Sequence, residues 1–206
     1  MNPQSLATSA KRSGFTLMEL ITVITIIAIL ATMAMPAHHM AMKRMRKLQA
    51  TNMASNLRTA VTEYQSEYKR FPALSDGSGV EEINGDLKVE TTGDSGLMAL
   101  LMAVKDNEFA EKYNRRMISF FAAKPAKAKG MAGLWVSSEG NYELYDPWKN
   151  HYYVIYDADL SNSITAPSEK DGTDTELITD LMVFTHGPNG ELGAGDERKN
   201  DDIYVY

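Results

Sequence analysis

The sequence predicts an α+β fold in which one long amino-terminal helix packs on a small antiparallel β-sheet. Two patterns indicate the helix: an apolar run from Phe15 to Met35, and an apolar stripe at helical spacing that continues to Tyr68. A third pattern indicates the sheet, because short segments rich in aromatic and β-branched residues, separated by turn residues, follow Leu134. The chain of 206 residues therefore suits a long helix followed by one globular domain.

The apolar run is long enough to cross a membrane. Residues 15–35 are 21 residues with one formal charge, Glu19, and Lys11 and Arg12 lie just before them. At ~1.5 Å rise per residue, a helix of this length reaches roughly 31 Å, which matches the hydrocarbon core of a bilayer. We therefore expect residues 15–36 to form a transmembrane helix, preceded by a short polar leader of residues 1–14.

Glu19 is the unusual residue of this run. A carboxylate at the centre of a membrane helix costs ~2.5–3.5 kcal/mol, so an acid there indicates a function. One alternative is that Glu19, close to the start of the run, reaches the lipid headgroups. The other is that it pairs with a cation at the same depth, and cleavage between Gly14 and Phe15 would create one, the α-amino group of Phe15. Pairing between neighbouring copies is head-to-tail, so it can build a helical filament.

The residues around this point resemble a known export signal. The segment from Lys11 to Glu19 reads Lys-Arg-Ser-Gly-Phe-Thr-Leu-Met-Glu, and it resembles the class III signal of type IV pilins and type II secretion pseudopilins. The resemblance implies that a prepilin peptidase cuts after Gly14 and methylates the new amine of Phe15, and that Glu19 guides filament assembly. Pro36 falls where many members of the family carry a proline that kinks the helix.

Charge is distributed unevenly along the chain. Residues 1–68 hold seven Lys/Arg against three Glu, and residues 69–206 hold 14 against 24 acids, which together give the net charge of −6. An acidic domain argues against a nucleic-acid partner and suits a solvated domain that binds cations. The absence of cysteine excludes disulfides and thiolate metal sites.

The orientation in the membrane follows from the family and not from the charges. Four basic residues between 43 and 47 outnumber Lys11 and Arg12, so the positive-inside rule favours an amino terminus outside the cytoplasm. The family resemblance implies the reverse: a single pass through the bacterial inner membrane, with the domain in the periplasm and later in a periplasmic filament.

An amphipathic helix is expected to continue from residue 37 to residue 70. Its narrow apolar stripe consists of Ala50, Ala54, Leu57, Val61, Tyr64 and Tyr68. The pair Phe71-Pro72 ends the helix, because the residue before a proline disfavours the helical conformation. The stripe is the expected seam for the α+β domain of residues 71–206.

Within that domain, the sequence predicts short elements joined by turns. We expect a strand at residues 83–89, a helix at 96–101 capped by Asp94 or Ser95, and a helix at 108–122. Strands are expected at 142–145, 152–157 and 181–184. Asp146-Pro147-Trp148 resembles a segment of major pseudopilins, although Lys149 and His151 replace its usual glycine and proline, and Trp148 is expected to pack on the long helix.

The final stretch of the chain has the chemistry of a calcium loop. Residues 185–203 combine glycines with many oxygen donors, and Ca²⁺ takes 6–8 oxygen ligands. The stretch is similar to the calcium-binding carboxy-terminal loop of major pseudopilins, which implies Asn189, Asp201 and Asp202 as side-chain ligands. Asn189 stands where an aspartate is usual and supplies a neutral oxygen. The alternative is a plain acidic surface loop.

Taken together, the resemblance implies a subunit of the periplasmic pseudopilus that drives type II protein secretion, most like the major pseudopilin. Its partners would be the prepilin peptidase, identical subunits and other pseudopilins, and the inner-membrane assembly platform. A type IV pilus subunit for adhesion, motility or DNA uptake is the alternative with the same architecture. A monomeric tethered binding protein and a tethered enzyme are further alternatives. The four histidines are scattered and no Ser/His/acid set is recognisable, so we expect no catalysis.

Overall fold

The computed structural model describes residues 14–72, 74, 78–166, 175–191 and 202–206, without the side chains of residues 33–37. Contacts divide the chain into two units, residues 1–44 and residues 45–206. Helix α1 (Leu17–Tyr68) contributes to both units, and Pro36 lies inside it without ending it. The kink expected at Pro36 stays a prediction.

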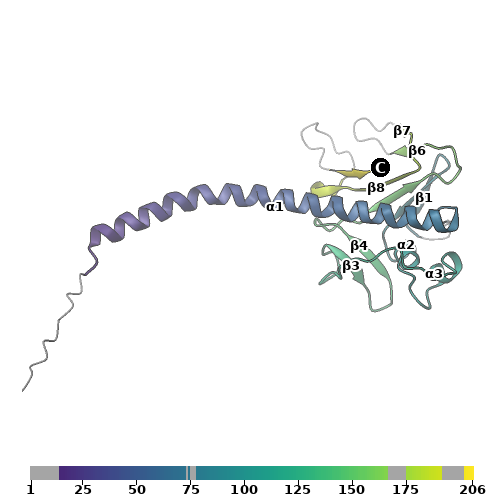
Figure 1. Ribbon diagram of the computed structural model, residues 1–206, viewed down its shortest axis with the longest axis horizontal. Coiled ribbons are helices and arrows are strands. Elements are labelled where there is room, and N and C mark those ends of the chain that lie inside the picture. Colours follow the sequence, from purple (N-terminus) through teal and green to yellow (C-terminus); the bar gives the residue numbers. More distant parts are fainter. Residues whose placement is uncertain (1–13, 73, 75–77, 167–174, 192–201) are drawn as a thin grey trace, which may run out of the picture. The chain divides into compact units, whose positions relative to one another are not determined.

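The second unit contains a five-stranded antiparallel sheet (Figure 1). Its strands are, in spatial order, β1 (Val80–Ile83), β2 (Asp86–Glu90), β5 (Tyr153–Tyr156), β8 (Leu181–Thr185) and β9 (Ile203–Val205). Two further pairs of strands form separate two-stranded antiparallel sheets: β3 (Gly133–Val136) with β4 (Tyr142–Tyr145), and β6 (Ile164–Ala166) with β7 (Thr175–Leu177). Helices α2 (Leu97–Leu101) and α3 (Glu108–Tyr113) and the 3₁₀ turn η1 (Gly187–Asn189) complete the described elements. The α+β prediction is confirmed.

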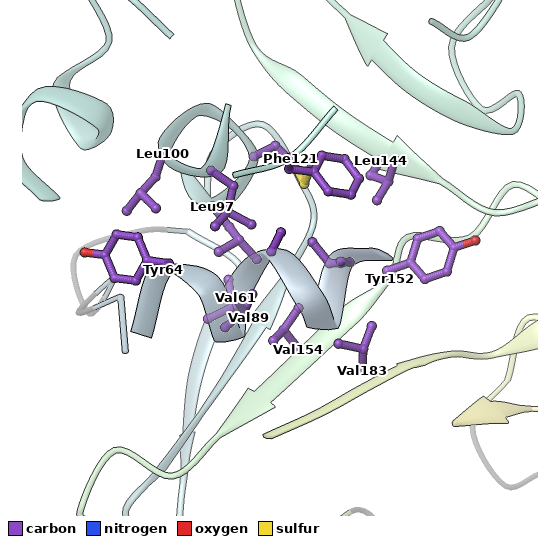
Figure 2. Close-up of a cluster of buried hydrophobic side chains, with 14 of the residues drawn as sticks. Val61, Tyr64, Val89, Leu97, Leu100, Phe121, Leu144, Tyr152, Val154 and Val183 are labelled. Carbon is purple, nitrogen blue, oxygen red and sulfur yellow. The ribbon is translucent and has the colours of Figure 1, made fainter. Parts of the chain in front are cut away.

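The main hydrophobic core lies between the sheet and the carboxy-terminal part of α1 (Figure 2). The predicted stripe is buried at Ala50, Ala54, Leu57, Val61 and Tyr64. Sheet residues of the same cluster include Val89, Val154 and Val183, which are paired across β2, β5 and β8, and α2 adds Leu97, Leu100 and Leu101. The stripe is therefore the seam of the domain, as the sequence predicts.

The two faces of the sheet belong to different clusters. In β5, Val154 and Tyr156 join the cluster around α1, while Ile155 joins a second cluster with Met182 and Phe184. This alternation follows from the two-residue period of a strand. Ile164, Ala166 and Leu177, from the β6–β7 hairpin, pack in the second cluster. Burial on both faces explains why β8 is apolar from Leu181 to Phe184.

Helix α1 ends where the sequence predicts. Lys69 adopts a positive φ of 57°, and Phe71 stacks on Tyr156 with 5.1 Å between ring centroids. The Tyr156 hydroxyl donates to the backbone oxygen of Pro72. These contacts fix the chain as it leaves the helix.

The strand expected at residues 83–89 is confirmed for residues 86–89, which lie in β2, but is wrong at its start, because the chain reverses there. Asn84 and Gly85, with φ of 52° and 97°, form the turn between β1 and β2, and Ile83 pairs with Asp86. An Asn-Gly pair with two positive φ values is the preferred two-residue hairpin turn. The signal was present in the sequence at this position.

The helix expected at residues 108–122 is also wrong beyond Tyr113. Asn114 ends it, because its Nδ2 donates to the backbone oxygens of Leu100 (2.9 Å) and Ile118 (2.7 Å) and its Oδ1 accepts from the Ile118 N–H. An asparagine side chain thereby takes the partners that a continuing helix would give to the backbone. Met117 has a positive φ of 51°, which no helix accommodates.

Two smaller expectations are corrected as well. The residue at the amino-terminal cap position of α2 is Gly96, at φ 71°, and neither Asp94 nor Ser95; the Ser95 hydroxyl donates to the Thr92 backbone oxygen and accepts only a long contact, 3.5 Å, from the Leu97 N–H. Trp148 is half-buried and belongs to neither described cluster. Tyr152 is the aromatic residue of this region that reaches α1, with its hydroxyl 3.4 Å from the Ala50 backbone oxygen.

Candidate functional site

The predicted cleavage site lies directly before α1, outside any helix or strand. Gly14, Phe15 and Thr16 precede the first helical residue, Leu17. All three are exposed, and no atom lies within 4 Å of the position that a Cβ on Gly14 would occupy. The peptide bond between Gly14 and Phe15 is therefore accessible to a protease.

Glu19 belongs to a reciprocal cap at the start of α1. The Thr16 backbone N–H and the Thr16 hydroxyl both donate to Oε2 of Glu19, each at 2.9 Å, and the Glu19 N–H donates back to the Thr16 hydroxyl at 3.2 Å. This is the capping box, in which two residues three apart satisfy each other's free donors. Among the described residues, the second carboxylate oxygen, Oε1, accepts no hydrogen bond.

The apolar side chains after Glu19 are exposed in the single chain. They include Leu20, Ile24, Ile27 and Leu30, each more than half exposed. An unbroken apolar surface of this kind marks a site of contact with lipid or protein. Within the described part of the chain, which leaves out the side chains of 33–37, no helix is both long and apolar enough to cross a membrane.

A buried carboxylate organises the Asp146-Pro147-Trp148 turn. Asp146 is fully buried and accepts from the backbone N–H groups of Trp148 and Asn150 at 2.8 Å, from Asn150 Nδ2 at 3.2 Å, and from the Thr185 hydroxyl at 2.7 Å. Asn150 Nδ2 also donates to the Gly187 backbone oxygen at 2.6 Å. Burial raises the pKa of Asp146, and these hydrogen bonds oppose the rise. The turn is thereby fixed to the end of β8, where the candidate calcium stretch begins.

The three predicted calcium ligands are only partly described. Asn189 is exposed at the end of η1, and its Oδ1 accepts from the Glu191 N–H at 2.9 Å. Asp202 is buried directly before β9, and the pairing of Thr185 with Ile203 brings it beside the end of β8. Asp201 lies outside the described residues. The donors have the hard-oxygen chemistry that calcium requires.

A second group of carboxylates has ligand atoms within 4.8 Å of one another: Asp86, Asp157 and Asp159. Each already accepts from a backbone N–H, since Thr165 donates to Asp86, Asn162 to Asp157 and Ser161 to Asp159. Burial raises the pKa of Asp86. The Asp157-Ala158-Asp159 pattern is visible in the sequence, but Asp86 joins it only through the pairing of β2 with β5.

Comparison with known proteins identifies the amino-terminal segment. A family model described as the prokaryotic N-terminal methylation motif matches the chain at residues 9–35. Residues 9–35 carry a type IV pilin-like signal. Neither the search of curated proteins nor the search of solved structures found a match.

The methylation motif supports a pilin-like precursor in the broad sense. It is typical of proteins that a prepilin peptidase processes and that are anchored in a membrane before they join a filament. Proteins with this motif are structural subunits. The match covers the predicted cleavage site, the Thr16–Glu19 cap and the exposed apolar residues, so the site of interest in this chain is its amino-terminal segment.

Proposed function

We propose that this chain is a structural subunit of a periplasmic pseudopilus that drives type II protein secretion, most like the major pseudopilin. The observation that carries the proposal is the methylation motif over residues 9–35, with Gly14, Phe15 and Glu19 at its centre. In this proposal the prepilin peptidase removes residues 1–14 and methylates the amine of Phe15. The assembly platform of the inner membrane then moves the subunit into the filament.

The Thr16–Glu19 cap supports a role of Glu19 in assembly. Thr16 keeps its backbone N–H after cleavage at Gly14, so both of its donors to Oε2 persist in the processed chain. The cap offsets part of the cost of placing a carboxylate in lipid. It also leaves Oε1 for the Phe15 amine of a neighbouring copy, which is the head-to-tail contact of a filament.

The membrane anchor in this proposal is the apolar run of residues 15–35. Its exposed side chains lose contact with water in a bilayer, at roughly 25 cal/mol per Å² of apolar surface removed from water. Extraction from the membrane into a filament must replace lipid by neighbouring helices. The same apolar surface therefore serves both the stored subunit and the assembled one.

A secretion role is favoured over a pilus role by the segment at Asp146 and by the oxygen-rich stretch of residues 185–203, both of which resemble major pseudopilins. The buried Asp146 ties the first to the second through Thr185 and Asn150. The alternative with the same amino-terminal signal is a subunit of a type IV pilus that serves adhesion, motility or DNA uptake. Assays of cargo export and of surface pili in a strain lacking this chain separate the two roles.

We also propose that Ca²⁺ binds the stretch that contains Asn189, Asp201 and Asp202. Binding to the folded state alone must raise the melting temperature. The test is thermal unfolding of the full chain in detergent, with and without calcium at about a millimolar, a level at which extracellular calcium modules fill. Asp202→Asn should remove the shift and Asp157→Asn should leave it. Absence of any shift would exclude the site.

The main experiment compares processing and assembly in one strain. Mass spectrometry of the chain from membranes with an active prepilin peptidase should show loss of residues 1–14 and one added methyl group. A strain with an inactive peptidase should keep the leader. Retention of residues 1–14 in the presence of the active enzyme would refute the proposal.

Assembly is tested with a matched pair of glutamates on α1. Glu19→Gln should abolish cross-linked filaments while leaving cleavage intact, because it removes the charge that meets the amine. Glu63→Gln, at an exposed position of the same helix, should assemble as the parent does. Normal filaments from Glu19→Gln would favour a tethered monomeric protein or another assembly contact.

A further inference from the structure

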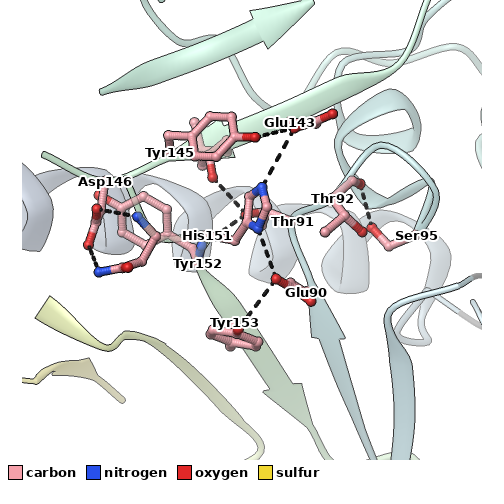
Figure 3. Close-up of polar contacts among 12 residues, drawn as sticks. Glu90, Thr91, Thr92, Ser95, Glu143, Tyr145, Asp146, His151, Tyr152 and Tyr153 are labelled. Carbon is pink, nitrogen blue, oxygen red and sulfur yellow. Dashed lines mark hydrogen bonds and ion pairs between the residues drawn. The ribbon is translucent and has the colours of Figure 1, made fainter. Parts of the chain in front are cut away.

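A histidine lies between two carboxylates from different strands of the second unit (Figure 3). Nδ1 of His151 is 2.8 Å from Oε1 of Glu90, at the end of β2, and Nε2 is 3.7 Å from Oε2 of Glu143, in β4. The side chain of His151 is 20% exposed and that of Glu143 is 11% exposed. The imidazole thus links the main sheet to the β3–β4 hairpin.

The surroundings of His151 exclude water from its second nitrogen. Nε2 is buried and has no hydrogen-bond partner among the described residues, while the Tyr145 ring lies 4.4 Å from the imidazole ring, centroid to centroid. A buried nitrogen without a partner costs about 1–3 kcal/mol. The site therefore favours whichever state of the ring satisfies this atom.

Only the doubly protonated ring satisfies both carboxylates. A neutral imidazole has one N–H and one lone pair, so when Nδ1 donates to Glu90, the lone pair of Nε2 faces Glu143. The other tautomer reverses the conflict and leaves Glu90 facing a lone pair. An imidazolium donates at both nitrogens, and a movement of under about 1 Å brings Nε2 to hydrogen-bond distance of Glu143.

Other charged and titratable groups also contact the two carboxylates that face the His151 ring. Lys129 is 3.2 Å from Oε1 of Glu143, and the Tyr145 hydroxyl donates to Oε2. On the other side, the Tyr153 hydroxyl donates to Glu90, and the Lys88 charge acts on the same carboxylate. Because Lys88 is itself paired with Glu81 at 2.8 Å, the two carboxylates against Lys129 leave one negative charge that a protonated His151 neutralises.

Both carboxylates are held in the charged form that this arrangement needs. The hydrogen bond from His151 is the main cause that lowers the pKa of Glu90. Burial alone would raise the pKa of Glu143, but hydrogen bonds from Tyr145 and Lys129 outweigh it, and the pKa of Glu143 is lowered. Both groups therefore remain anionic across the range in which histidines change charge.

We propose that His151 is a proton-dependent latch, which holds the β3–β4 hairpin to the end of β2 when protonated and releases Glu143 when neutral. The hairpin is also fixed independently of pH, since the Leu144 N–H donates to the Thr91 backbone oxygen (3.0 Å) and the Thr91 hydroxyl donates to the Leu144 oxygen (3.0 Å). Loss of the proton therefore loosens the hairpin without unfolding it.

The test is amide hydrogen exchange of the full chain in detergent, compared between about pH 5.5 and about pH 8. Protection of the hairpin amides, corrected for the intrinsic exchange rate, should be about tenfold higher at the lower pH, the effect of one charge-assisted hydrogen bond. Equal protection at both pH values would overturn the latch.

Variants separate the latch from ordinary packing. His151→Gln and Glu143→Gln should each remove the pH dependence, and the second keeps the test valid if the first fails to fold. Thr91→Val should lower protection at both pH values and keep the tenfold ratio. Glu139→Gln, at an exposed position of the same hairpin, should behave as the parent. A pH dependence that survives in both latch variants would contradict the proposal.

Discussion

The Asp146 network gives the most direct test of how the domain is held together. Asp146→Ala removes one fully buried carboxylate that accepts four hydrogen bonds, two of them from backbone N–H groups. The Thr185 hydroxyl, also buried, then loses the acceptor at 2.7 Å. The turn at residues 146–150 loses its fixed connection to β8.

The expected loss of free energy of unfolding depends on which of the donors to Asp146 can bind water instead. The N–H groups of Trp148 and Asn150 belong to half-buried residues, so water replaces part of what they lose. The buried Thr185 hydroxyl has no such replacement and costs about 1–3 kcal/mol. Burial raises the pKa of Asp146, so the charged carboxylate is costly to bury. Its removal therefore restores part of the free energy of unfolding that is lost. We expect Asp146→Ala to lower the free energy of unfolding by about 2–4 kcal/mol.

The assay is denaturant unfolding of the full chain in detergent, followed by tryptophan fluorescence, because Trp148 lies inside the turn. Thr185→Val removes one donor and should cost about 0.5–1.5 kcal/mol. The double variant should cost less than the sum of the two, because Thr185→Val also removes the orphaned donor. An Asp146→Ala protein within about 0.5 kcal/mol of the parent would refute the reasoning.

Two further predictions concern backbone conformation and alkaline stability. Gly96→Ala should cost about 2 kcal/mol more than Gly140→Ala in the same unfolding assay, because both have positive φ but only the Cβ at 96 would meet the Phe109 ring; equal costs would contradict this. Burial raises the pKa of Tyr64 to about 12 from 10.0, so its contribution to stability is complete below pH 10 and is lost as the pH rises through about 12. Tyr64→Phe should lower the free energy of unfolding by about 0.5–1.5 kcal/mol at neutral pH, since the hydroxyl donates to the Tyr113 oxygen. Between pH 10 and about 12, the variant should lose less of its free energy of unfolding than the parent does. The same alkaline loss in both proteins would count against this prediction.

Elements with strong local patterns could be predicted from the sequence. The stripe of α1 and the strand at residues 142–145 appear as expected, because a 3.6-residue or two-residue period needs only local information. The expected helix at 108–122 fails at Asn114, whose side chain binds backbone groups of α2 and of the following loop. The periodicity of the apolar residues does not reveal that a side chain will compete with the helix for these backbone groups.

The candidate site divides in the same way. The predicted cleavage site and Glu19 both lie between residues 14 and 19, and the sequence contains the whole pattern that the family model matches. The acids Asp86 and Asp157 lie on strands that are distant in the sequence and meet only because β2 pairs with β5. No spacing rule predicts such a meeting.

The sequence by itself determined that this chain carries a type IV pilin-like signal followed by a long helix, because a contiguous apolar run and a short motif are complete within one segment. Only the tertiary structure decided that His151 sits between Glu90 and Glu143. The imidazole acquires its two partners when β4 packs beside the end of β2, so its chemistry depends on distances in space and not on distances along the chain.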